Sequence, residues 1–159
     1  MTESSFDTNI YERSSGIVLG FHGCDEAVAE EVLNSQCKHL RGSINTYDWL
    51  GNGIYFWLND PKRAYEWACR ELGYSLNEKF KNEVPDEGGF NLVRPLDCAV
   101  IKHAHELVEA KGVYYDTVYG YFQEGADAYD GAGIKEKSHI QICVRNTDCI
   151  KGYFLPRII

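Results

Sequence analysis

Long apolar runs, basic clusters and an export signal are all missing from this sequence. No stretch approaches the roughly 18 consecutive apolar residues of a transmembrane helix, and residues 1–13 are polar and acidic. Sixteen Lys and Arg stand against 24 Asp and Glu, which gives a net charge of −8 without a basic block. We therefore expect no membrane contact and no nonspecific binding to nucleic acid, whose phosphates attract basic surfaces.

Metal-binding cysteine spacings are also missing. The six cysteines include no C-x-x-C pair, and the five histidines do not complete a zinc spacing with them. We expect no bound metal. Because no export signal precedes the cysteines, the sequence favours a cytoplasmic protein with free thiols, while disulfides in a secreted protein are the less favoured alternative.

Apolar and aromatic residues, by contrast, are abundant. They make up 44% and 13% of the 159 residues, which is typical of a folded chain and not of a disordered one. The length fits one ordinary domain. We predict a polar N-terminal arm over residues 1–15 and a single domain over residues 16–159.

The domain begins with a pattern typical of a strand, a turn and a helix. Residues 16–23 form a short apolar run with β-branched residues and glycines at both ends, which favours a buried strand. Asp25 can cap the helix that follows. The apolar positions of this helix repeat with its period and are Val28, Ala29, Val32 and Leu33.

A second strand and helix follow. Residues 53–58 predict the strand, and Asp60 and Pro61 are typical of an N-cap and a first helical residue. We expect this helix to end at Gly73. Residues 74–95 are charged and glycine-bearing without a sustained period, so we interpret them as a surface excursion.

The C-terminal part carries one more helix and then mainly strands. Asp97 is the expected cap of a helix that ends at Gly112. Residues 117–122 and 139–144 alternate like strands, and the apolar residues 150–155 predict another. Helices that come early and strands that come late indicate the α+β class rather than a regular βαβ repeat.

Two segments carry a specific resemblance. His22-Gly23 ends the first predicted strand. Residues 51–56 read Gly-Asn-Gly-Ile-Tyr-Phe, and Tyr55 in this segment lies 33 positions after His22. Together they resemble the first two signatures of the ADP-ribosyltransferase superfamily, in the His-Tyr-Glu branch that includes poly(ADP-ribose) polymerases and small bacterial and phage enzymes. The resemblance covers about residues 16–155. It implies two small antiparallel sheets with flanking helices and an NAD cleft between the sheets.

The resemblance also implies roles for four residues in binding NAD as a substrate. His22 would hydrogen-bond a ribose hydroxyl, and the main chain of Gly23 would hold the nicotinamide carboxamide. Tyr55 would stack on the nicotinamide ring, and Tyr65 would cover its other face. Two aromatic faces suit a cationic ring because the ring quadrupole attracts positive charge.

The third family position departs from the pattern. The last predicted strand places Gln141 where the catalytic glutamate is expected, and glutamine carries no charge to stabilise the transition state. Glu136 in the preceding loop and Glu124 at the end of the previous strand are alternative sources of the carboxylate. The resemblance implies a single transfer of ADP-ribose rather than chain elongation.

Each of these residues also has a structural alternative. His22 fits a hydrogen-bonded histidine at a strand end, Tyr55 fits a core aromatic, and Tyr65 shares a helical face with apolar residues. Gln141 fits a polar strand position, and the two glutamates fit solvated charges.

We predict an NAD-dependent mono-ADP-ribosyltransferase that acts on a protein or nucleic-acid acceptor. Two alternatives are an NAD- or ADP-ribose-binding module without turnover, and an RNA 2′-phosphotransferase of the same superfamily. The net charge of −8 makes the phosphotransferase a distant option, because its phosphorylated RNA substrate needs basic residues. The resemblance also implies a toxin-like role with an antitoxin or immunity partner.

Overall fold

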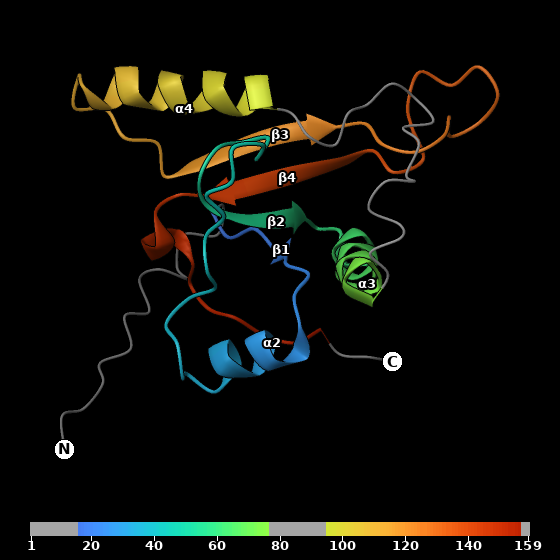
Figure 1. Cartoon of the computed structure of the whole chain (residues 1–159), viewed down its shortest axis with the longest axis horizontal. Helices are drawn as coiled ribbons and strands as arrows, with labels where there is room; N and C mark the ends of the chain where they lie inside the picture. Colours follow the sequence, from blue (N-terminus) through green and yellow to red (C-terminus); the bar gives the residue numbers. More distant parts are fainter. Residues whose placement is uncertain (1–15, 77–94, 157–159) are drawn as a thin grey trace.

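The computed structural model describes residues 16–76 and 95–156, which form an open antiparallel sheet with helices around it (Figure 1). The α+β class is thereby confirmed. In chain order the elements are β1 (Gly20–Phe21), α2 (Glu26–Leu33), β2 (Ile54–Leu58), α3 (Pro61–Leu76), α4 (Pro95–Glu109), β3 (Thr117–Phe122), β4 (His139–Val144) and the 3-10 helix η2 (Thr147–Cys149).

The four strands belong to one sheet with the order β1-β2-β4-β3. In its centre β2 pairs with β4, with Tyr55 opposite Cys143 and Trp57 opposite Gln141. The expectation of two small sheets is therefore wrong for the described residues. Strand periodicity does not reveal which strands pair, and the β2–β4 ladder joins all four. The strand expected over residues 150–155 is also wrong, since this segment follows η2 without pairing to the sheet.

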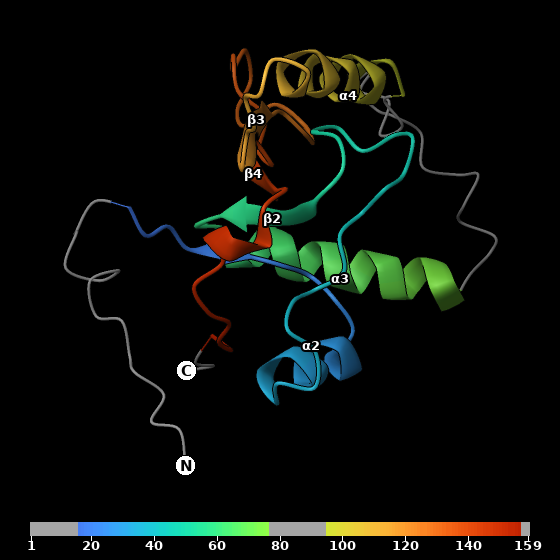
Figure 2. The same ribbon diagram turned by 90° about the vertical axis from the view of Figure 1, so that its left-hand side faces the viewer.

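The two faces of the sheet differ because alternate side chains of a strand point to opposite sides. Ile54 and Phe56 of β2 face a hydrophobic core, whose other buried members are Val32, Leu40, Ile142 and Val144. Tyr55 and Trp57 face the other side. Figure 2 shows α4 beside β3, with α2 on the far side of the sheet from α4, and Figure 1 shows α3 beyond the end of β2.

Helix boundaries agree with the sequence in some places and differ in others. Asp60 caps α3, because its carboxylate accepts a hydrogen bond from the Arg63 backbone N–H at 3.0 Å. However, α3 continues through Gly73 to Leu76, since one glycine costs a helix only about 1 kcal/mol. Helix α4 begins at Pro95, two residues before the expected cap Asp97, because proline suits the first helical position.

Some predictions lie outside the described residues: the arm over residues 1–15 and most of the predicted excursion, at 77–94. The first strand is shorter than the predicted range of 16–23 and spans only Gly20–Phe21. All six cysteines are free thiols. No helix in the described part of the chain combines the length and apolar character needed to cross a membrane.

Candidate functional site

The first two sequence motifs meet at His22. Antiparallel pairing sets Phe21 opposite Trp57, so His22 comes next to the main chain of Tyr55. Its Nδ1 lies 2.7 Å from the Tyr55 carbonyl oxygen. The imidazole is half-buried, and its ring centroid lies 5.7 Å from that of Phe56.

This contact determines the tautomer of His22. A carbonyl oxygen only accepts hydrogen bonds, so Nδ1 carries the hydrogen and Nε2 keeps its lone pair in the neutral ring. Burial lowers the pKa of His22, and the bond to the Tyr55 carbonyl offsets part of that effect. At neutral pH His22 is therefore an uncharged hydrogen-bond acceptor at Nε2.

Tyr55 uses its hydroxyl group to close the loop before β2. The hydroxyl donates to the Gly51 carbonyl at 2.7 Å and accepts from the Leu50 N–H at 2.9 Å. Burial is the main cause that raises the pKa of Tyr55, so the phenol stays protonated. Gly51 is buried and has a φ of +81°, a left-handed conformation that favours glycine. The loop is thus fixed around the tyrosine ring.

The central pair of strands aligns Gln141 with this motif. Gln141 is half-buried on β4, between Trp57 of β2 and Gly120 of β3. Its neighbour two residues on, Cys143, lies opposite Tyr55 and is fully buried. Because residues opposite each other share a face, Gln141 and Tyr55 are on the same side of the sheet.

Gly23 and Tyr65 have different surroundings. A Cβ on Gly23 would lie 2.3 Å from the Ala64 carbonyl oxygen and 3.1 Å from the Ala68 nitrogen, so this glycine lets the chain approach α3 closely. Tyr65 is 71% exposed on α3. A hydrogen bond with Cys69, one helical turn on, raises the pKa of its hydroxyl.

The two alternative carboxylates contact other residues. Glu124 forms an ion pair with the guanidinium of Arg63, which also bonds Glu66 at 2.9 Å. Glu136 is exposed, and its side chain lies against Gly125 in the loop between β3 and β4. The described contacts join neither carboxylate to Gln141 or His22.

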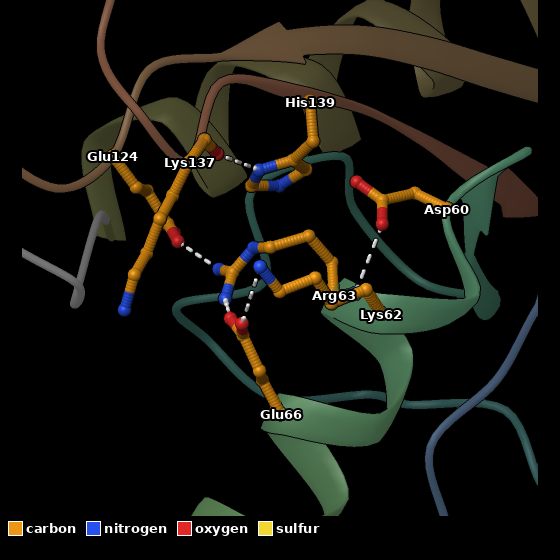
Figure 3. Close-up of polar contacts among 7 residues, drawn as sticks. All are labelled: Asp60, Lys62, Arg63, Glu66, Glu124, Lys137 and His139. Carbon is orange, nitrogen blue, oxygen red and sulfur yellow. Dashed lines mark hydrogen bonds and ion pairs between the residues drawn. The ribbon is translucent and has the colours of Figure 1, made fainter. Parts of the chain in front are cut away.

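Arg63 is a residue that the sequence interpretation missed. It is only 8% exposed, although arginine is rarely buried without a partner. Figure 3 shows its guanidinium between Glu124 and Glu66, with His139 pointing toward it. The one available signal was its place on a predicted helix, directly before the apolar Ala64.

His139 is the second missed residue. It is 5% exposed, and its Nδ1 donates to the Lys137 carbonyl at 2.8 Å. The ring centroid lies 6.4 Å from that of Trp57. The Nε2 of His139, the Nε1 of Trp57 and the Nε of Arg63 are all buried without a hydrogen-bond partner.

Neither a metal centre nor a relative defines the site. Within the described ranges, no three His, Cys, Asp or Glu side chains gather in a group that could hold a metal ion. In comparisons with protein-family models, curated proteins and solved structures, nothing matches the chain. Membership of the ADP-ribosyltransferase superfamily stays a prediction from the two motifs.

Proposed function

We propose that this protein is an NAD-dependent mono-ADP-ribosyltransferase. The observation that carries the proposal is the 2.7 Å bond from His22 Nδ1 to the Tyr55 carbonyl. It joins the two motifs and leaves His22 Nε2 as a neutral acceptor. Such an acceptor suits a ribose hydroxyl, which must donate a hydrogen bond to be held there.

The surroundings of Tyr55 support a role in holding nicotinamide. Its hydroxyl is committed to Leu50 and Gly51, so its ring has a fixed orientation. A fixed aromatic face attracts a cationic ring without a large loss of side-chain entropy on binding. The main chain of Gly23 would hold the carboxamide of the same ring, and Tyr65 on α3 would cover the ring's other face.

The reaction begins with cleavage of the bond between the nicotinamide nitrogen and the ribose C1′. The bonding pair leaves with nicotinamide, which becomes neutral, and positive charge develops on the ribose. The acceptor's nucleophile then bonds C1′ and loses its proton to solvent. Gln141 would accept a hydrogen bond from the ribose 2′-hydroxyl, an interaction that strengthens as the charge develops.

The contacts of the two glutamates favour Gln141 for the third position. Glu124 is already paired with Arg63, and Glu136 is exposed at the loop. An amide oxygen is a weaker acceptor than a carboxylate, so we expect slow turnover and single transfers.

Release of nicotinamide from NAD tests the proposal. The wild-type protein should release nicotinamide, and His22→Ala should lower the rate by about 10²-fold, as losing one positioned polar group often does. His103→Ala is the matched control, because His103 is exposed on α4 and pairs only with Glu106 among the described contacts. Equal rates for the two variants would remove His22 from the site.

A binding module without turnover is the second candidate, and the missing charge at Gln141 favours it. Calorimetry would then show NAD binding while intact NAD is recovered after long incubation. Gln141→Glu separates the two functions, since a carboxylate at the ribose should raise nicotinamide release by about tenfold or more. Gln123→Glu is the control, since it adds the same charge elsewhere on the β3–β4 hairpin.

A further inference from the structure

Arg63 lies in a cluster of charges that the proposed reaction does not use. Its side chain is 10% exposed, and that of Glu124 is 14% exposed. The guanidinium bonds Glu124 through Nη2 and Glu66 through Nη1. A rigid guanidinium fork fixes the geometry of two carboxylates more strictly than the point charge of a lysine does.

The partners of Arg63 connect two separate parts of the fold. Arg63 belongs to the first turn of α3, directly after β2, whereas Glu124 follows the end of β3. The main-chain oxygen of Glu124 accepts from the Lys137 N–H at 3.0 Å. The Lys137 carbonyl accepts in turn from His139, the first residue of β4 and two residues before Gln141.

The centre of the cluster is shielded from solvent, whereas the side chain of Glu66 at its edge is 33% exposed. Arg63 Nε and His139 Nε2 are buried and have no hydrogen-bond partner. Charges in such surroundings interact more strongly than at the surface, and removing one partner leaves the other uncompensated. A buried ion pair contributes little to the net free energy of folding. The main role of the cluster is therefore to fix the positions of the groups that it joins.

We propose that Arg63 is a positioning residue that sets the place of Gln141 relative to β2, an inference that rests on the proposed function. The guanidinium holds the loop end of the β3–β4 hairpin against α3. It thereby keeps Gln141 opposite Trp57, on the face that carries Tyr55. The same contact commits the carboxylate of Glu124, so Glu124 acts on the hairpin rather than on NAD.

The first experiment measures kcat and KM for nicotinamide release with Arg63→Lys. Lysine keeps the charge but cannot reach two carboxylates in fixed geometry. We expect kcat to fall by about tenfold or more with KM within about threefold, because the contact of Gln141 strengthens in the transition state. Lys62→Ala, on the same turn but with an 85% exposed side chain, should change neither value.

The second experiment compares Glu124→Gln with Glu124→Ala. Glutamine keeps an oxygen that accepts from Arg63, so a positioning role predicts a much smaller loss of kcat for Glu124→Gln. A catalytic carboxylate at this position predicts equal losses, because both variants remove the charge. Equal losses, or an Arg63→Lys variant with the kcat and KM of Lys62→Ala, would overturn the proposal.

Hydrogen exchange separates this proposal from the proposed function. If the wild-type protein releases no nicotinamide, the proposed function fails, and exchange then decides whether Arg63 positions the hairpin. Arg63→Lys should speed exchange over residues 139–144 by about tenfold more than over residues 54–58, since the opening is local. Exchange equal to that of Lys62→Ala in both segments would show that Arg63 does not hold β4.

Discussion

Tyr55 supports the loop before β2 through its hydroxyl, and this leaves its ring for the proposed contact with nicotinamide. The hydroxyl satisfies a backbone donor and a backbone acceptor, at Leu50 and Gly51. Either group, left buried and unpaired, would cost free energy. The structural and ligand-binding interpretations of this tyrosine are therefore compatible.

Removing only that hydroxyl tests the structural part. Tyr55→Phe should lower the free energy of unfolding by about 1–3 kcal/mol, because it leaves the Leu50 N–H without its partner and the Gly51 carbonyl with only the Cys143 thiol, 3.8 Å away. Tyr119→Phe is the control, since Tyr119 is 52% exposed on β3. Urea denaturation measures both, and equal stability of the two variants would contradict the role of the Tyr55 hydroxyl.

His22 makes stability depend on pH in a defined direction. Burial lowers its pKa below the ordinary value of 6.5, so below that pH the unfolded chain binds a proton that the folded chain does not. The free energy of unfolding should therefore fall as the pH drops through about 6.5, by at most about 1.4 kcal/mol per pH unit for one proton.

Comparison of variants isolates this contribution, because burial also lowers the pKa of His105. His22→Gln should flatten the pH dependence of the free energy of unfolding between pH 7 and 5, measured by denaturant titration. His103→Gln, a change at an exposed histidine, should leave the slope as in the wild type. An unchanged slope for His22→Gln would mean that His22 titrates alike in the folded and unfolded chain.

The sequence could indicate those candidate site residues that belong to a short motif. His22 and Tyr55 were found by their motifs, but their backbone contact was not, since it depends on the pairing of β1 with β2. Arg63 was missed because its partner Glu124 lies 61 residues away in the chain. No local pattern reports such a pair.

Among the elements, the periodic segments were predicted best. The strands over residues 117–122 and 139–144 and the helix after Asp25 are confirmed, because their alternation or 3.6-residue period reflects burial of one face. The number of sheets was wrong, because strand pairing is a long-range property. The missing strand at residues 150–155 shows the same limit, since apolar residues such as Tyr153 pack on the core without pairing.

Gly23, which follows β1, lies so close to the α3 backbone that a larger residue does not fit there. Gly23→Ala should lower the free energy of unfolding by about 1–3 kcal/mol, because the new methyl group would overlap the α3 backbone at Ala64. Gly16→Ala is the control, since nothing lies within 4 Å of its added Cβ. Thermal denaturation compares the two, and a tolerated Gly23→Ala would mean that α3 does not pack closely here.

For the molecule as a whole, the net charge of −8 bears on the proposed binding of NAD and on the proposed acceptor. An acidic protein gives no general attraction to the two phosphates of NAD, so the proposed binding of NAD needs local hydrogen-bond donors and the proposed contacts of Tyr55 and Tyr65 with nicotinamide. The same charge disfavours nonspecific contact with nucleic acid, so an acceptor must be recognised by specific contacts.

Transfer of ADP-ribose to an acceptor is the most direct measurement of the proposed activity. A cell extract is incubated with NAD and either the wild-type protein or His22→Ala, and mass spectrometry then searches the macromolecules for ADP-ribose adducts. We predict single adducts with the wild-type protein and a large loss of them with His22→Ala. Equal adduct levels in both samples, or none in either together with full recovery of NAD, would contradict the account.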